Sequence, residues 1–259
     1  MGISFGYRAR VGLIYQGLID SEFSLFLPKG VTVHIARFIN DVEESKMFEE
    51  GQWAIEEGCD LFLNSAVRQL TFIEVNSIAF GCTSGTFSRG VKFDMEIIQK
   101  IEEISGGIPA TTASSAVADA LDTLGLRKIA VGTPYSKNLN VKLRKFLEDM
   151  GFDVVNMKSI QLLSPLARDN PSGPLAAGWN ISRQSQEAVY QLAMDVDKSE
   201  ADGVFLSCTS LRTAEILKEL EEDLGKPVIS SNQALMWKLR KLSGIRTPVE
   251  DYGKLLACR

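Results

Sequence analysis

The sequence repeats itself: segments of its first half return in its second half, in the same order and at nearly the same distance. Pro109 and Pro227 each precede a short segment that contains paired hydroxyl residues and ends in alanine, followed by a helical pattern, 118 residues apart (227 − 109). The tripeptide Cys-Thr-Ser begins at Cys82 and again at Cys208, 126 residues apart (208 − 82). Chance rarely produces several matches at nearly one offset, so we expect two related structural units.

Within each unit, apolar runs alternate with helical patterns. Seven runs have the composition of strands: Val11–Tyr15, Val31–Ile35, Ser77–Phe80, Lys128–Val131, Val154–Asn156, Val204–Leu206 and Val228–Ser230. Helical periodicity marks Asn140–Met150, Thr213–Leu224 and Asn232–Leu242. Strands separated by helices are typical of parallel sheets. The predicted fold is therefore α/β, with two pseudo-symmetric lobes that face each other across a cleft, each a parallel sheet flanked by helices.

The repeat also predicts where the lobes divide. We expect residues 1–125 together with 241–259 to form the first lobe, and residues 126–240 to form the second. No low-complexity linker separates the two, so a broad interface between the lobes is expected.

Charge and hydropathy argue against several classes of protein. The net charge is −5 and no clustered positive field is present, which argues against a nucleic-acid partner. No run of about 18 apolar residues predicts a membrane span, and the N-terminus lacks the apolar core of a signal peptide. We therefore expect a cytoplasmic protein without a membrane partner. The sequence leaves the oligomeric state open, with a homo-oligomer as one alternative.

The residue inventory also argues against a metal or an organic cofactor. His34 is the one histidine, and it is predicted to be a strand residue, while no Cys-x-x-Cys pair occurs. No phosphate-binding loop, dinucleotide fingerprint or PLP lysine motif is recognisable. We expect no metal and no cofactor.

Two of the four cysteines have neighbours that suggest chemistry. Cys82 and Cys208 each follow a predicted strand and precede a helical stretch, which is where open parallel sheets bind ligands. Backbone N–H groups at the start of a helix attract anions. Four hydroxyl groups add hydrogen-bond donors for a carboxylate: Thr83, Ser84, Thr209 and Ser210. The same position predicts a lowered thiol pKa, hence a thiolate able to act as base or nucleophile.

The other two cysteines lack such neighbours. Cys59 lies in a predicted turn that enters a strand, and we expect it to be structural. Cys258 is next to the last residue, and we expect it to be inert.

At the two Cys-Thr-Ser segments the sequence resembles the PLP-independent aspartate/glutamate racemase superfamily. It is most similar to the branch of maleate cis–trans isomerases, arylmalonate decarboxylases and ectoine-utilisation proteins. Four motifs carry the resemblance over nearly the whole chain: Phe80–Gly85, Gly132–Tyr135 with Leu139 and Asn140, Ser207–Thr213, and Pro227–Leu235 followed by Trp237. The resemblance implies an active site in the cleft between the lobes, with Cys82 and Cys208 as catalytic residues. It implies a small carboxylate or amino acid as substrate, with Tyr135 hydrogen-bonded to its carboxylate.

The resemblance leaves the reaction open. Racemases of the superfamily take a proton with one cysteine and return it with the other, whereas maleate isomerases use the first cysteine as a nucleophile on the double bond. Its decarboxylases keep only the second cysteine, so the presence of both favours an isomerase. A decarboxylase and a non-catalytic small-acid-binding protein remain the alternatives.

Two segments depart from the family pattern. The segment Ile14–Phe23 is shorter than in the maleate isomerases and lacks their asparagine, for which Gln16 is the one candidate replacement. Ser164–Asn180, rich in proline and glycine, is predicted to be a loop that covers the cleft. The three tryptophans are expected to pack in the core or an interface: Trp53, Trp179 and Trp237.

Overall fold

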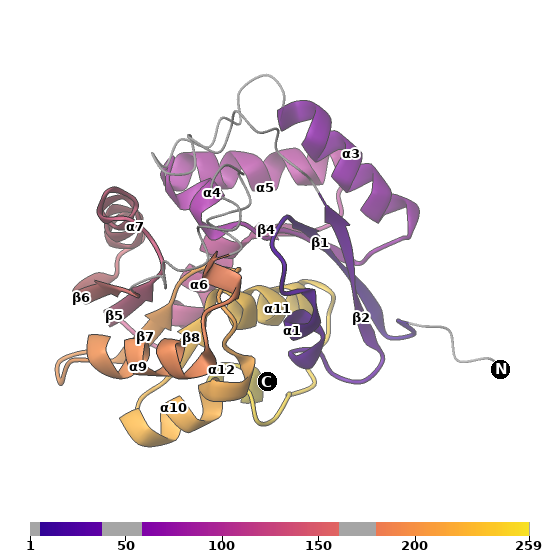
Figure 1. Ribbon diagram of the computed structural model, residues 1–259. Coiled ribbons are helices and arrows are strands. Elements are labelled where there is room, and N and C mark those ends of the chain that lie inside the picture. Colours follow the sequence, from indigo (N-terminus) through magenta and orange to yellow (C-terminus); the bar gives the residue numbers. More distant parts are fainter. Residues whose placement is uncertain (1–5, 38–58, 161–179, 259) are drawn as a thin grey trace.

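The two sheets have equivalent strand orders. The computed structural model describes residues 6–37, 59–160 and 180–258 (Figure 1). In the first sheet the order is β2-β1-β3-β4, and in the second it is β6-β5-β7-β8, all strands running parallel. The strands are β1 Ala9–Tyr15, β2 Val31–Arg37, β3 Ser77–Phe80, β4 Ala110–Thr112, β5 Lys128–Thr133, β6 Asp153–Ser159, β7 Gly203–Leu206 and β8 Val228–Ser230. The predicted α/β fold of two pseudo-symmetric lobes is confirmed.

Helices cover both faces of each sheet. They are α1 Asp20–Leu25, α3 Cys59–Phe72, α4 Thr83–Phe87, α5 Val91–Ser105, α6 Ala113–Thr123, α7 Lys137–Asp149, α9 Gln186–Val196, α10 Leu217–Leu224, α11 Ser231–Leu242 and α12 Lys254–Ala257, with a 3-10 turn η3 at Ala214–Ile216. On the first sheet, α3 and α5 lie over one face and α11 lies on the other (Figure 1). None of these helices is long and apolar enough to cross a membrane in the part of the chain that the structure describes.

The repeat extends to individual hydrogen bonds at the ends of the central strands. The residue after β3, Gly81, donates its N–H to Ile14 O at 2.8 Å. The residue after β7, Ser207, donates its N–H to Gly132 O, also at 2.8 Å. In each lobe the next residue along the chain is the cysteine of the Cys-Thr-Ser segment. The two cysteines therefore leave their sheets at equivalent points.

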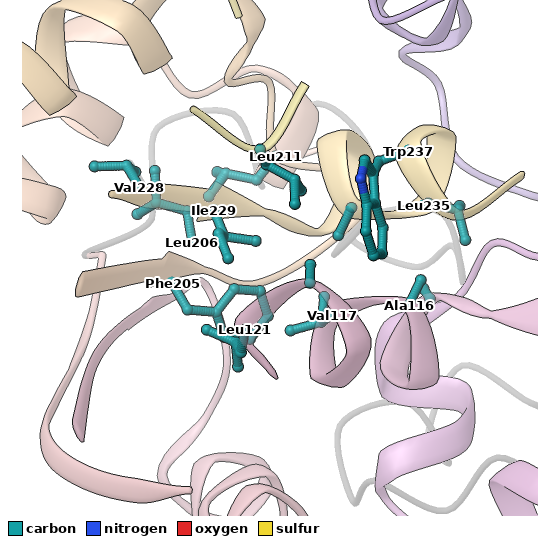
Figure 2. Packing of buried hydrophobic residues seen from close by; sticks show 14 of the residues in the cluster. Ala116, Val117, Leu121, Phe205, Leu206, Leu211, Val228, Ile229, Leu235 and Trp237 are labelled. Atoms are coloured by element: carbon teal, nitrogen blue, oxygen red, sulfur yellow. The ribbon is translucent and has the colours of Figure 1, made fainter. Parts of the chain in front are cut away.

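Helices α6 and α11 are exchanged between the lobes. Helix α11 follows the second sheet but contacts β1, β3 and β4 of the first, where Ser77 Oγ donates to Leu239 O at 3.0 Å. Helix α6 follows the first sheet but also contacts β8 of the second. Figure 2 shows Val117 and Leu121 of α6 facing Phe205 of the second sheet within one hydrophobic cluster. The apolar core is therefore continuous from one lobe to the other.

This exchange bears on the predicted division at residues 125 and 240. Because α6 contacts strands β4 and β8, and α11 contacts β4 and β8 as well, no single cut of the chain assigns each helix to one lobe. The domain boundaries stay a prediction. Trp237 of α11 is buried in the core, as expected (Figure 2).

The prediction for Cys59 is wrong. Cys59 does not lie in a turn that enters a strand; it begins helix α3. The reason is the spacing of the buried apolar residues that follow, Leu63, Ala66, Val67 and Leu70, which recur with helical period. His34 lies in β2 as predicted. Trp53, Trp179 and residues 164–179 of the predicted cleft-covering loop lie outside the described residues.

Candidate active site

Cys82 and Cys208, one from each lobe, line the same cavity. The other lining residues are Tyr15, Gln16, Gly17, Gly81, Thr83, Ser84, Tyr135, Thr209 and Ser210. All seven residues that the sequence singled out as site residues are thus brought together. The cavity measures about 20 Å³, which is room for roughly one water molecule. The cavity that both cysteines line is therefore small.

Cys82 is held at the start of a short helix. It is the N-cap residue of α4, is 6% exposed, and its Sγ lies 3.8 Å from Ser84 Oγ. A Cβ atom at Gly85 would lie 3.1 Å from this Sγ, so glycine leaves the sulfur its space. Burial raises the pKa of the Cys82 thiol to about 11, although hydrogen bonds from Gly85 N–H and Ser84 oppose that rise.

Cys208 lies on a turn, whereas the sequence predicted a helical stretch directly after it. The next helical residue is Ala214, and Cys208 itself has a φ of 117°, a conformation that residues with a side chain rarely adopt. Ser210 N–H donates to Cys208 Sγ at 3.4 Å. Burial raises the pKa of Cys208 as well, against hydrogen bonds from Ser210 and Tyr135 that lower it.

The expectation of an acidic thiol is therefore wrong. Helix α4 has five residues and Cys208 begins no helix, so few aligned N–H groups stabilise a thiolate. Removal of water from both sulfurs disfavours their charged forms more strongly, which raises both pKa values. Both cysteines rest as thiols near neutral pH.

We expect alkylation of Cys82 by iodoacetamide to be slow at pH 7 and to accelerate about tenfold per pH unit, because the thiolate fraction rises in that way below the pKa. The increase should level off only near pH 11, the pKa of this thiol. Cys208, which is less buried, should react first. Peptide mapping by mass spectrometry at several pH values gives the rate at each cysteine. A Cys82 rate already maximal at pH 7 would contradict this assignment.

Tyr135 lies between strand β5 and helix α7, and its side chain reaches the Cys208 sulfur. Its hydroxyl accepts a hydrogen bond from Ser207 Oγ at 3.3 Å and is hydrogen-bonded to the Cys208 thiol. Burial raises the pKa of Tyr135 well above its usual value, so the side chain is a neutral donor. The ring packs against Phe87 at 5.5 Å between centroids.

Thr83 and Thr209 are at the site, but their hydroxyl groups bind the opposite lobe. Thr83 Oγ1 donates to Ser231 Oγ at 3.2 Å, and Thr209 Oγ1 donates to Gly81 O at 2.9 Å. We expected these hydroxyls to face a substrate. Each hydroxyl instead donates a hydrogen bond across the lobe interface. The symmetry of the repeat places each Cys-Thr-Ser segment against the other lobe. The other two hydroxyls that the sequence singled out, those of Ser84 and Ser210, lie beside the two sulfurs instead.

Sequence reasoning missed Tyr15 and Ser231. Tyr15 is 1% exposed, and its hydroxyl donates to Thr209 O at 3.0 Å. Ser231 Oγ accepts the N–H of Cys208 at 3.1 Å. The repeat held a signal for Tyr15: it is the last residue of β1, as Thr133 is of β5, 118 residues later (133 − 15). Gln16 also lines the cavity, and its part in binding stays a prediction.

The cavity wall is electrically neutral. Among the described residues that line it, there is no lysine, arginine, aspartate or glutamate. Across the described ranges, no group of three or more histidine, cysteine, aspartate or glutamate side chains is placed to hold a metal ion. A carboxylate here would be bound by hydroxyl and amide donors.

Two matching parallel sheets, each presenting a cysteine at the end of a central strand to one shared cavity, define a class of two-lobed α/β proteins with paired thiols. The model of the arylmalonate decarboxylase family matches residues 55–256, and the chain belongs to this family.

Relatives with two different activities are similar to the chain. Arylmalonate decarboxylase of Bordetella bronchiseptica is 28% identical over 205 residues, which cover 77% of this chain and 80% of the relative. Maleate isomerase of Geobacillus stearothermophilus is 23% identical over 194 residues, covering 73% of this chain and 72% of the relative.

Solved structures of both kinds share the fold. A glycine-to-cysteine variant of arylmalonate decarboxylase with associated sulfate has a TM-score of 0.79 and 24% identity, covering 95% of this chain and 99% of its own. A cysteine-to-alanine variant of the maleate isomerase of Pseudomonas putida S16, with maleate, has a TM-score of 0.78 and 18% identity, covering 96% of this chain and 98% of its own. A cysteine-to-serine variant of the Nocardia farcinica maleate cis–trans isomerase, with a covalently bound succinylcysteine intermediate, has a TM-score of 0.77 and 16% identity, covering 96% and 98%.

Proposed function

We propose that the chain is an isomerase that acts on a small carboxylate without a cofactor, with Cys82 and Cys208 as its two reactive groups. The observation that carries the proposal is the single cavity to which each lobe contributes one thiol. The resemblance adds a reason, because decarboxylases of the superfamily keep only the second cysteine. The two forms of the proposal are a racemase and a cis–trans isomerase.

As a racemase, the site transfers one proton in and one proton out. The thiolate of one cysteine removes the proton from the α-carbon and becomes a thiol, and the electron pair passes into the carboxylate as an enediolate. The thiol of the other cysteine then protonates the opposite face and becomes a thiolate. The two cysteines exchange protonation states in each turnover, so such an enzyme works in both directions.

As a cis–trans isomerase, the site forms a transient carbon–sulfur bond. The Cys82 thiolate adds to one carbon of the double bond while the Cys208 thiol protonates the other, which leaves a saturated thioether. Rotation about the new single bond and the reverse elimination give the trans acid and restore both groups. The succinylcysteine of the Nocardia farcinica enzyme supports this form.

Both reactions build negative charge on the substrate carboxylate. In the part of the chain that the structure describes, the cavity wall carries no acidic side chain that would repel this charge. Tyr135 and the hydroxyls of Ser84 and Ser210 are donors already positioned beside the two sulfurs. In a site from which water is excluded, fixed donors stabilise developing charge more than they do in water. The raised pKa of each thiol also matches it to a weakly acidic carbon.

The test is turnover in D₂O followed by proton NMR. Maleate should yield fumarate, or a small amino acid should lose its α-proton signal and racemise; dialysis against EDTA should not change the rate. A second candidate, decarboxylation, is favoured by the family model and by the relative at 28% identity. An arylmalonate is therefore included, and carbon dioxide release from it alone, without isomerisation or exchange elsewhere in the panel, would reject the isomerase.

A further inference from the structure

We propose that Tyr15 is a positioning residue for Cys208, supplied by the opposite lobe. Its hydroxyl holds the backbone of the Cys208 turn in a strained conformation, and thereby fixes where the second sulfur lies. The inference rests on the proposed function only in treating Cys208 as a reactive group, and its first readout needs no substrate.

The Cys208 turn requires an external restraint. With a φ of 117°, Cys208 lies outside the left-handed helical region that holds Glu74 (φ 56°) and Asp251 (φ 71°), the other described non-glycine residues with positive φ. Such backbone is strained and persists only where the surrounding structure imposes it. The residues that impose it therefore control the place of the sulfur.

Two restraints reach the turn through its neighbour Thr209, and both come from the first lobe. Tyr15 Oη donates to Thr209 O at 3.0 Å, and Thr209 Oγ1 donates to Gly81 O at 2.9 Å. Both bonds are buried, so they face no competition from solvent. Thr209, the residue directly after Cys208, is thus tied to β1 and to the residue after β3.

The far end of the same turn is tied to the same part of the first lobe. Glu22 of α1 is 1% exposed, and its Oε1 accepts the N–H groups of Thr213 and Ala214, each at 2.7 Å. The Phe23 ring meets the Tyr15 ring edge-on at 5.0 Å between centroids. Tyr15 and Glu22 therefore restrain the two ends of the same turn.

The position of the Tyr15 hydroxyl is itself protected by the chain. A Cβ atom at Gly17 would lie 2.0 Å from that oxygen, so any other residue at this position would displace it. The carbonyl of Gly17 accepts from Arg37 Nη1 at 2.7 Å, which holds the loop in place. A glycine is required here because of Tyr15, and this gives a second, independent way to move the hydroxyl.

The experiment compares Tyr15→Phe with Tyr190→Phe. Tyr190 hydrogen-bonds Asp223 on the surface of the second lobe, so it is a matched control that removes a hydroxyl elsewhere. Alkylation of each cysteine at pH 8 is followed by peptide mapping. Tyr15→Phe should change the Cys208 rate at least about threefold, faster because the relaxed turn is better hydrated, and leave the Cys82 rate unchanged. Gly17→Ala should do the same, and Tyr190→Phe should do neither.

A kinetic readout follows once a substrate is in hand. Tyr15→Phe should lower kcat at least about tenfold with KM within about threefold, because a misplaced sulfur weakens the transition state more than binding. Wild-type alkylation rates at both cysteines in Tyr15→Phe would overturn the inference, as would an equal change at both. If no isomerisation is found, the proposed function fails while the alkylation result still decides the inference.

Discussion

Replacement of Cys208 by serine should reduce kcat/KM at least about a thousandfold, and so should replacement of Cys82. A serine hydroxyl is far too weak an acid and its alkoxide far too rare to exchange protons with carbon near neutral pH. Steady-state kinetics on the substrate found by NMR measures the loss. Cys258→Ser is the matched control: it removes a thiol that does not line the cavity, and it should retain wild-type activity.

The two single variants also separate the two forms of isomerase. In a racemase, each variant keeps one competent thiol and should still exchange the α-proton of one enantiomer with D₂O. In a cis–trans isomerase, Cys82→Ser should form no covalent adduct, whereas Cys208→Ser should slow turnover and accumulate one, visible by intact-protein mass spectrometry. Full activity in Cys82→Ser together with none in Cys208→Ser would contradict both and indicate a one-cysteine decarboxylase.

Replacement of Glu22 by alanine should destabilise the fold by about 3–5 kcal/mol, because it strips the acceptors from a buried hydrogen-bonded network. Thr213 N–H, Ala214 N–H and Asn232 Nδ2 all donate to this carboxylate at 2.7–2.8 Å. Without it, two backbone donors remain buried without partners. Urea unfolding monitored by circular dichroism measures the change in the free energy of unfolding.

Two further variants make the Glu22 result specific. Glu22→Gln keeps the shape and one acceptor oxygen, so it should lose less than Glu22→Ala. Glu96→Ala removes an exposed carboxylate that pairs with Lys92 at 3.6 Å on one helix face, and it should stay within about 0.5 kcal/mol of the wild type. Equal effects of Glu22→Ala and Glu96→Ala would mean that the bonds from α1 to the Cys208 turn add little.

The repeat explains why the fold was predictable while the details of the site were not. Matching strand ends at Cys82 and Cys208 suffice to predict two equivalent lobes and a shared cavity. The repeat misleads after the cysteines, because Cys82 begins a helix and Cys208 begins a strained turn. That difference arises from packing between the lobes: Tyr15 and Thr209 are 194 residues apart in the chain, and no local pattern joins them.

The thiol pKa values show the same limit. A strand-to-helix position predicts stabilisation of the thiolate, and that effect is local enough to be read from sequence. Burial acts in the opposite direction and is stronger at both sulfurs. Its extent depends on Tyr15, Tyr135 and the other residues that converge on the cavity from both lobes. The burial of each sulfur by residues that are distant in the sequence is known only from the three-dimensional structure.

The exchanged helices α6 and α11 also bear on the origin of the chain. One lobe alone would lack the helix that packs on its sheet from the other lobe. Two copies of one lobe would supply this helix to each other and form a twofold homodimer with a swapped helix. Duplication and fusion of a gene for such a lobe would give the present arrangement. In a homodimer both cysteines would have to occupy identical surroundings. Only a fused chain allows one to begin a helix while the other sits on a strained turn held by its neighbour.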